Sequence, residues 1–85
     1  MAMTKGEYRV GIDFNPSNDD MVGQIKRKAA DLIDLIETIP MEAVVSTNAE
    51  VMRQTEVVRL KALAQTEIES AAMWAVKAAT KPAKA

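Results

Sequence analysis

The fold is decided by one uninterrupted stretch, residues 47–80, which reads TNAEVMRQTEVVRLKALAQTEIESAAMWAVKAAT. From Ala49 to Thr80 it contains neither Gly nor Pro and is rich in Ala, the residue with the strongest preference for helix. Thr47 followed by Glu50 has the form of a capping box, in which two side chains bond free backbone N–H groups at a helix start. The stretch therefore predicts one helix of about 32 residues, roughly 48 Å long.

A second, shorter helix is predicted over residues 19–39. Ser17 or Asn18 is placed to cap its start, and Pro40 ends it, because proline disfavours helical backbone in the residue before it. Between these limits, apolar residues recur at alternating spacings of three and four, the pattern of a helix that packs along a partner helix. These residues are Val22, Ile25, Ala29, Leu32, Ile36 and Ile39. We expect this seam to face the longer helix.

The two helices predict an all-α fold, a two-helix antiparallel hairpin with a short N-terminal arm. The arm spans residues 1–18, the hairpin domain 19–80 and a flexible tail 81–85. The arm shows no helical period; Tyr8, Val10, Ile12 and Phe14 alternate with other residues, a weak signal for extended backbone. With no second strand to pair with, this segment is expected to be an ordered arm and not a sheet.

The longer helix is predicted to extend about 18 Å beyond the shorter one. We place this overhang at the carboxy end, around Trp74, the only tryptophan. Much of the girth of the helix is apolar there, and a helix that is apolar on several sides is buried. We therefore expect a compact homo-oligomer in which Trp74 fills a gap in the subunit interface.

Composition excludes several classes of function. The chain contains no Cys and no His, which removes disulfides, thiolate metal sites and His-dependent nucleophilic catalysis. We therefore expect no enzyme activity, no catalytic residue, no metal and no cofactor. A net charge of −1 argues against a nucleic-acid polymer as partner. No apolar run approaches the roughly 18 residues of a membrane span, so a soluble, cytoplasmic protein is expected.

A small phosphate-bearing ligand is compatible with the charged residues. Tyr8 offers a face on which a base can stack, and the neighbouring Arg9 offers a fork for phosphate. Basic residues also cluster at 26–28 and at Arg59 with Lys61, while Gln65 and Thr66 add hydrogen-bonding groups. Each feature has an equally simple structural interpretation, such as arm packing or a solvated helix face. The residues alone leave both interpretations open.

Three blocks of sequence resemble the hairpin domain of phage anti-CBASS proteins, which anti-Thoeris proteins share. The first is RVGIDFNPS, residues 9–17, and the second is the IK within VGQIKRKAADLI, residues 22–33. The third has the pattern A-x-T, five residues, then A-M-W-x-V-K-A-x-T-K-P, and runs from Ala64 to Pro82. Together they cover nearly the whole chain.

The resemblance implies a homohexameric sponge that acts in the cytoplasm of an infected bacterium. Such proteins bind cyclic oligonucleotide signals, for example 3',3'-cyclic GMP-AMP, without cleaving them, and so block activation of CBASS effectors. For cyclic dinucleotides it implies Tyr8 as the stacking residue and Lys26 as the phosphate partner. The arm between these two is longer than the family pattern, so Arg9 or Phe14 is an alternative for stacking.

For cyclic trinucleotides the resemblance implies a separate site lined by Arg59, Gln65 and Thr66. Two other functions stay open at this point. The same scaffold in anti-Thoeris proteins takes a cyclic ADP-ribose signal. The seam from Val22 to Ile39 would also suit a helical bundle that binds a protein partner and no nucleotide.

Overall fold

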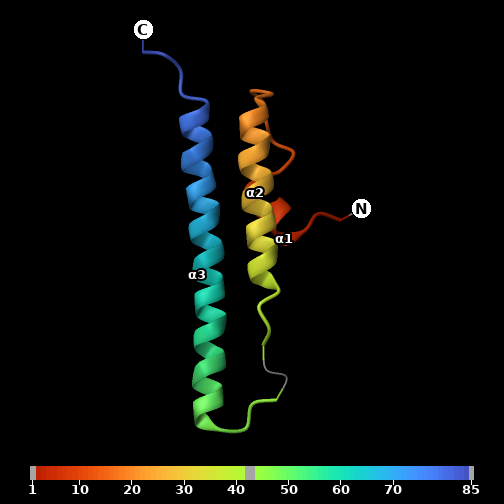
Figure 1. Cartoon of the computed structure of the whole chain (residues 1–85), viewed down its shortest axis with the longest axis vertical. Helices are drawn as coiled ribbons and strands as arrows, with labels where there is room; N and C mark the ends of the chain where they lie inside the picture. Colours follow the sequence, from red (N-terminus) through yellow and green to blue (C-terminus); the bar gives the residue numbers. More distant parts are fainter. Residues whose placement is uncertain (1, 42–43, 85) are drawn as a thin grey trace.

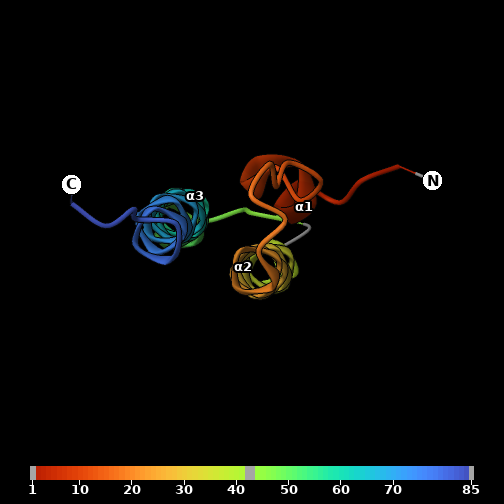
Figure 2. The ribbon, with the colours of Figure 1, turned by 90° about the horizontal axis from the view of Figure 1, so that it is seen from above.

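The computed structural model describes residues 2–41 and 44–84, and its regular secondary structure there is entirely helical. The elements are α1 (Lys5–Val10), α2 (Asp20–Glu37) and α3 (Asn48–Ala79). The two long helices lie side by side and antiparallel, and α1 packs beside α2 (Figures 1 and 2). The predicted all-α hairpin is therefore confirmed, with one helix more than expected. Within the described ranges, no helix is both long and apolar enough to cross a membrane.

The long helix predicted from Ala49 to Thr80 is observed as α3, and each of its ends is displaced by one residue. Thr47 is its N-cap, and the Thr47 hydroxyl accepts a hydrogen bond of 3.1 Å from the Glu50 N–H. The Glu50 carboxylate in turn accepts from the Ser46 N–H at 3.0 Å, one residue before the position that a strict capping box uses. These bonds satisfy N–H groups that have no partner within the helix.

The predicted ends of the shorter helix are wrong by one or two residues. Asp19 is the N-cap of α2, since its carboxylate accepts from the Met21 N–H at 2.9 Å. Asn18 does not cap the helix because its backbone is left-handed, with φ 53°. At the other end α2 stops at Glu37, and the Thr38 hydroxyl donates to the Leu35 carbonyl at 2.6 Å.

The extended arm predicted from the alternation of Tyr8 and Val10 is also wrong, because residues 5–10 form α1. Thr4 and Glu7 make a complete capping box at its start. Gly11 ends it in the left-handed conformation, with φ 64°, where an L side chain would be strained. Capping at both ends stabilises a helix too short to persist alone.

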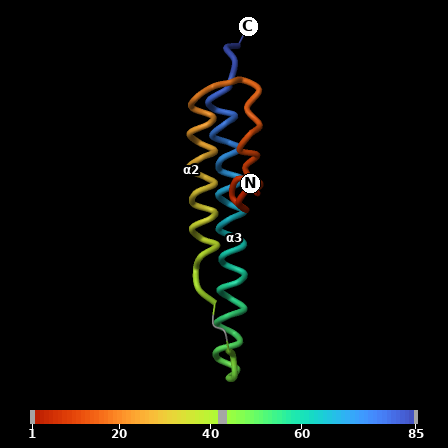
Figure 3. Tube along the Cα trace, turned by 90° about the vertical axis from the view of Figure 1, so that its right-hand side faces the viewer, coloured from red at the N-terminus to blue at the C-terminus, as the bar shows by residue number. Residues whose placement is uncertain are grey.

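The overhang of α3 lies at the end opposite to the one predicted. Lys61 Nζ donates to the carbonyls of Glu37 and Ile39 at 3.1 and 2.9 Å, so α2 ends beside the middle of α3. The first part of α3, residues 48–60, extends past the end of α2 (Figures 1 and 3). Trp74 therefore lies where α3 has α2 beside it, and the residue is nevertheless 67% exposed.

The apolar core of the single chain is small. Only Val22, Ala30, Ile33 and Ala72 are buried apolar side chains in the described part of the chain, together with the polar Lys26 and Gln65. Leu32 and Ile39 of the predicted seam are each 44% exposed, whereas Lys26, Ala30 and Ile33 are buried, so the buried face of α2 does not coincide with the seam. The chain measures 61 × 32 × 12 Å, so its shortest dimension is close to the diameter of one helix.

Candidate ligand-binding site

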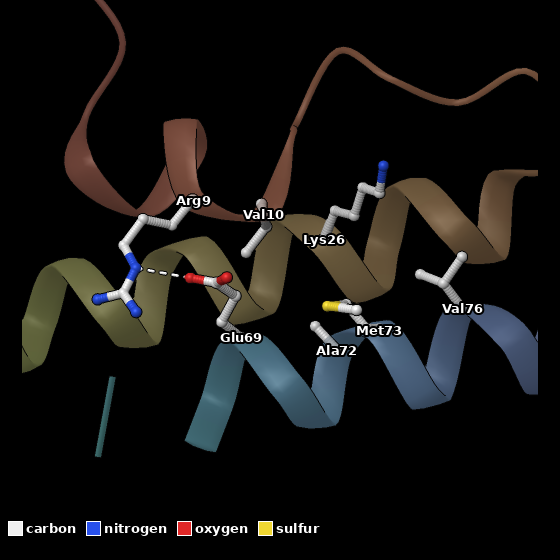
Figure 4. Close-up of a pocket in the computed structure, with 7 residues that line it drawn as sticks. All are labelled: Arg9, Val10, Lys26, Glu69, Ala72, Met73 and Val76. Atoms are coloured by element: carbon white, nitrogen blue, oxygen red, sulfur yellow. Dashed lines mark hydrogen bonds and ion pairs between the residues drawn. The ribbon is translucent and has the colours of Figure 1, made fainter. Parts of the chain in front are cut away.

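A pocket of about 290 Å³ opens where the three helices meet. Its lining comes from α1, α2 and α3 and consists of Arg9, Val10, Lys26, Glu69, Ala72, Met73 and Val76 (Figure 4). Four of these side chains are apolar and three are charged. Such a mixture can cover the face of an organic ring while fixing its polar groups at the rim.

Arg9 is held at the pocket by α3. Its Nε donates to Glu69 Oε1 at 2.6 Å (Figure 4). Its Nη2 donates to Thr66 Oγ1 at 3.3 Å. Arg9 occupies the last turn of α1, where a cation is favoured by the helix dipole. The structure thus brings Arg9 and Thr66 together, although the sequence assigned them to two different ligand sites.

Lys26 is 8% exposed and organises the turn that follows α1. Its ammonium group donates to the carbonyl of Gly11 at 3.0 Å and to the carbonyl of Phe14. The same Nζ lies 5.4 Å from the centre of the Phe14 ring, within the range of a cation–π contact. Lys26 and Phe14 are therefore neighbours, and the ammonium group is already bonded to carbonyls of the arm.

Tyr8 does not join this group within one chain. Its side chain is 78% exposed, and it is not among the seven residues that line the pocket. It is, however, on the same short helix as Arg9, so movement of α1 would move both.

The three residues predicted for a trinucleotide site have different surroundings. Gln65 is 1% exposed: its Nε2 donates to the Ile33 carbonyl at 3.1 Å, and its Oε1 accepts from Lys5 Nζ at 3.0 Å. Arg59 is exposed and pairs with Glu56, which raises the pKa of Arg59 and lowers that of Glu56. Thr66 and Arg59 are seven residues apart on α3 and so share one face, while Gln65 points inward.

Polar bonds from Lys5 and Gln65 meet at Glu37. Gln65 Nε2 and Lys5 Nζ donate to Glu37 Oε1 at 3.0 and 2.8 Å. The hydrogen bond from Gln65, then the bond and charge of Lys5, lower the Glu37 pKa from its ordinary 4.5 to about 2. The cluster connects all three helices, since these residues come from α1, α2 and α3.

Sequence reasoning missed most of the pocket wall. Glu69, Met73 and Val76 recur at spacings of four and three, so the pattern already placed them on one face of α3. The position of α1 against this face was missed, because the arm was interpreted as extended. No group of three metal-ligating side chains occurs in residues 2–41 and 44–84.

A known protein family matches most of the chain. The family described as Acb2/Tad1, hairpin domain, matches residues 6–80, which is 75 of the 85 residues and includes α2, α3 and all but the first residue of α1. No curated protein and no solved structure matches the chain. Because the match covers most of the chain, the protein belongs to the Acb2/Tad1 hairpin-domain family, the family of anti-CBASS and anti-Thoeris sponges.

Proposed function

We propose that the protein is a phage sponge that sequesters cyclic dinucleotide signals, such as 3',3'-cyclic GMP-AMP, in the cytoplasm of an infected bacterium. The observation that carries this proposal is the pocket where Arg9 and Lys26 border an apolar wall, in a chain of the sponge family. Either cation can bond a phosphate oxygen of such a ligand, and the apolar wall matches the face of a base. Binding alone would keep the signal from its effectors.

In this proposal Lys26 exchanges partners when the ligand binds. Its ammonium group would release the carbonyls of Gly11 and Phe14 and bond a phosphate oxygen, a stronger charge-assisted hydrogen bond. Phe14 lies beside Lys26 and Tyr8 is exposed on α1, so either ring is available to stack on a base. Arg9 supplies the second cation.

We further propose that the working form is a homohexamer. The radius of gyration is 16.7 Å, whereas a compact chain of this length would have one of roughly 12 Å. Large apolar side chains are exposed on both long helices, among them Leu35, Met52 and Trp74. A second, largely apolar hollow of about 330 Å³ lies between α2 and α3 and includes Ile36, Ile39 and Leu60. Neighbouring copies would cover these surfaces.

A cyclic trinucleotide site is part of the same proposal. Arg59 and Thr66 share one face of α3, so copies arranged around a symmetry axis would present a ring of these polar side chains. Gln65 lies behind them and would act by keeping α3 in place, since its amide is already bonded within the chain.

Native mass spectrometry tests the proposal directly. The purified protein is measured alone and with a panel of cyclic dinucleotides, cyclic trinucleotides and cyclic ADP-ribose isomers. We expect a hexamer that gains discrete dinucleotide masses and releases them unchanged on denaturation. Uptake of cyclic ADP-ribose alone would indicate an anti-Thoeris specificity, and uptake of nothing would favour a protein-interaction bundle.

Two variants test whether Arg9 and Lys26 form the dinucleotide site. Arg9→Gln combined with Lys26→Gln removes both pocket cations and should abolish dinucleotide binding. Lys28→Gln removes an exposed cation from the same helix and should leave binding unchanged. If the double variant binds as tightly as the original protein, the site lies elsewhere.

A further inference from the structure

We infer that Glu69 reads the Watson–Crick edge of a guanine, so that the sponge prefers guanine-bearing cyclic dinucleotides to adenine-only ones. This inference rests on the proposed function. It starts from an unexpected group: one of the three charged side chains around a pocket for an anionic ligand is itself an anion. A carboxylate facing a phosphodiester would weaken binding. Glu69 is therefore better suited to a part of the ligand that donates hydrogen bonds.

The geometry leaves one carboxylate oxygen of Glu69 available. Oε1 accepts the bond from Arg9 Nε, and Oε2 accepts none from any residue that the structure describes. Figure 4 shows this second oxygen on the side of the carboxylate that faces Val10 and Lys26, away from Arg9. A carboxylate accepts about four hydrogen bonds in total, so Oε1 also keeps capacity.

The wall next to Glu69 suits a flat ring. Ala72, Met73 and Val76 continue along the same face of α3, with Val10 opposite (Figure 4). The volume of about 290 Å³ is at the lower limit of ordinary ligand pockets, which fits one base and its phosphate but not a whole cyclic dinucleotide. A base lying on this wall would point its edge at Glu69 and its phosphate toward Arg9 or Lys26.

The chemistry of the base edge selects guanine. Its N1–H and N2–H₂ groups are adjacent donors, which match the two acceptor oxygens of a carboxylate. Adenine presents a donor at N6 beside an acceptor at N1, so one carboxylate oxygen would face a lone pair. A carboxylate oxygen that faces a lone pair is repelled by it, whereas a hydrogen bond to a charged group is among the stronger ones. We therefore expect discrimination of about 10-fold or more.

Calorimetric titration with three symmetric ligands tests this inference. Cyclic di-GMP presents both donors, cyclic di-IMP lacks the N2 amino group, and cyclic di-AMP presents the adenine edge. We expect cyclic di-GMP to bind about 10-fold more tightly than either of the others. In Glu69→Gln the amide offers one acceptor and one donor, which match the N6 donor and the N1 acceptor of adenine. The preference for cyclic di-GMP should therefore disappear or reverse.

The ratio of the affinities for two ligands, compared between the original protein and Glu69→Gln, distinguishes recognition of the base from other effects of the substitution. Glu69→Gln also weakens the hold on Arg9, but this affects the phosphate contact of all three ligands alike. Glu67→Gln makes the same chemical change at an exposed position two residues away and should keep the original ratios. Equal affinity for cyclic di-GMP and cyclic di-IMP, or an unchanged ratio in Glu69→Gln, overturns the inference alone. If no cyclic dinucleotide binds, the proposed function fails and the inference with it.

Discussion

The backbone of Gly6 lies so close to the backbone of Ala30 that a Cβ on residue 6 would sit 2.1 Å from the Ala30 carbonyl oxygen. The Gly6 N–H also donates to Asp34 Oδ1 at 2.7 Å, so α1 is fixed to α2 at two adjacent points. Ala30 is fully buried beneath this contact. The position of α1, and with it the position of Arg9 at the pocket, depends on the absence of a side chain at residue 6.

Gly6→Ala should therefore destabilise the protein. The new methyl group meets backbone, which cannot rotate away, and overpacking of this kind costs about 1–3 kcal/mol of unfolding free energy. Gly23→Ala is the matched control: apart from the adjoining backbone of its own helix, no atom lies within 4 Å of its added Cβ, and Ala gains about 1 kcal/mol over Gly in a helix. Urea denaturation of the three proteins measures the difference. If Gly6→Ala is as stable as Gly23→Ala, the close approach of the helices is not real.

Gln65→Met should also lower stability, because Met has a similar size but cannot form the hydrogen bonds of the amide. The change removes the amide's hydrogen bonds to the Ile33 carbonyl and to the Glu37 carboxylate, and it leaves Lys5 without one acceptor. Loss of such bonds costs about 1–3 kcal/mol. Gln24→Met on the exposed face of α2 should change the free energy of unfolding by less than about 0.5 kcal/mol. Equal effects at the two positions would contradict a structural role for Gln65.

Glu37 should make the stability depend on pH in a defined window. Its pKa in the folded protein is about 2, below the ordinary 4.5, so folding favours the ionised form. The resulting stability is present in full above pH 4.5 and is lost as the pH falls from 4.5 toward 2. Denaturation midpoints of the original protein should approach those of Glu37→Gln across this window. A constant gap between the two proteins from neutral pH to pH 2 would show that Glu37 is not coupled to Lys5 and Gln65.

Lys26→Met should loosen the turn after α1 without unfolding the long helices. Met keeps much of the length of the apolar stem but cannot donate to the carbonyls of Gly11 and Phe14. Hydrogen–deuterium exchange should therefore speed up in residues 11–18 and stay unchanged in the part of α3 beside α2. Lys28→Met, at an exposed position of the same helix, is the comparison. Unchanged exchange in residues 11–18 would mean that other contacts hold this turn.

Local signals in the sequence predicted the long helices well. Thr47 and the absence of Gly and Pro from Ala49 to Thr80 were enough to give the bounds of α3 to within one residue. The spacing Thr4-x-x-Glu7 with Gly11 following was an equally good signal for α1, but the alternation of apolar residues from Tyr8 to Phe14 concealed it. Short helices are decided by their caps, because they contain too few turns for a period to be visible.

Relations between the helices were not predictable in the same way. The overhang was placed at the wrong end because the apolar girth around Trp74 was taken to mark it, whereas α2 ends beside Lys61, well inside α3. The buried face of α2 was missed because Lys26 and Ala30 are not obvious core residues; their burial depends on the arm folding over them. At the site, Arg9 and Lys26 were among the predicted residues. Glu69 was not, because its place beside them depends on how α3 is aligned along the other two helices.

Trp74 gives the protein a built-in optical probe. It is the only tryptophan, the residue is 67% exposed, and Lys77 Nζ lies 5.5 Å from the centre of its ring. Its fluorescence spectrum therefore reports on one defined patch of α3, one residue away from Met73 in the pocket wall. A shift to shorter wavelength on raising the protein concentration would follow subunits covering that patch, and a change on adding nucleotide would follow the pocket, both without any label.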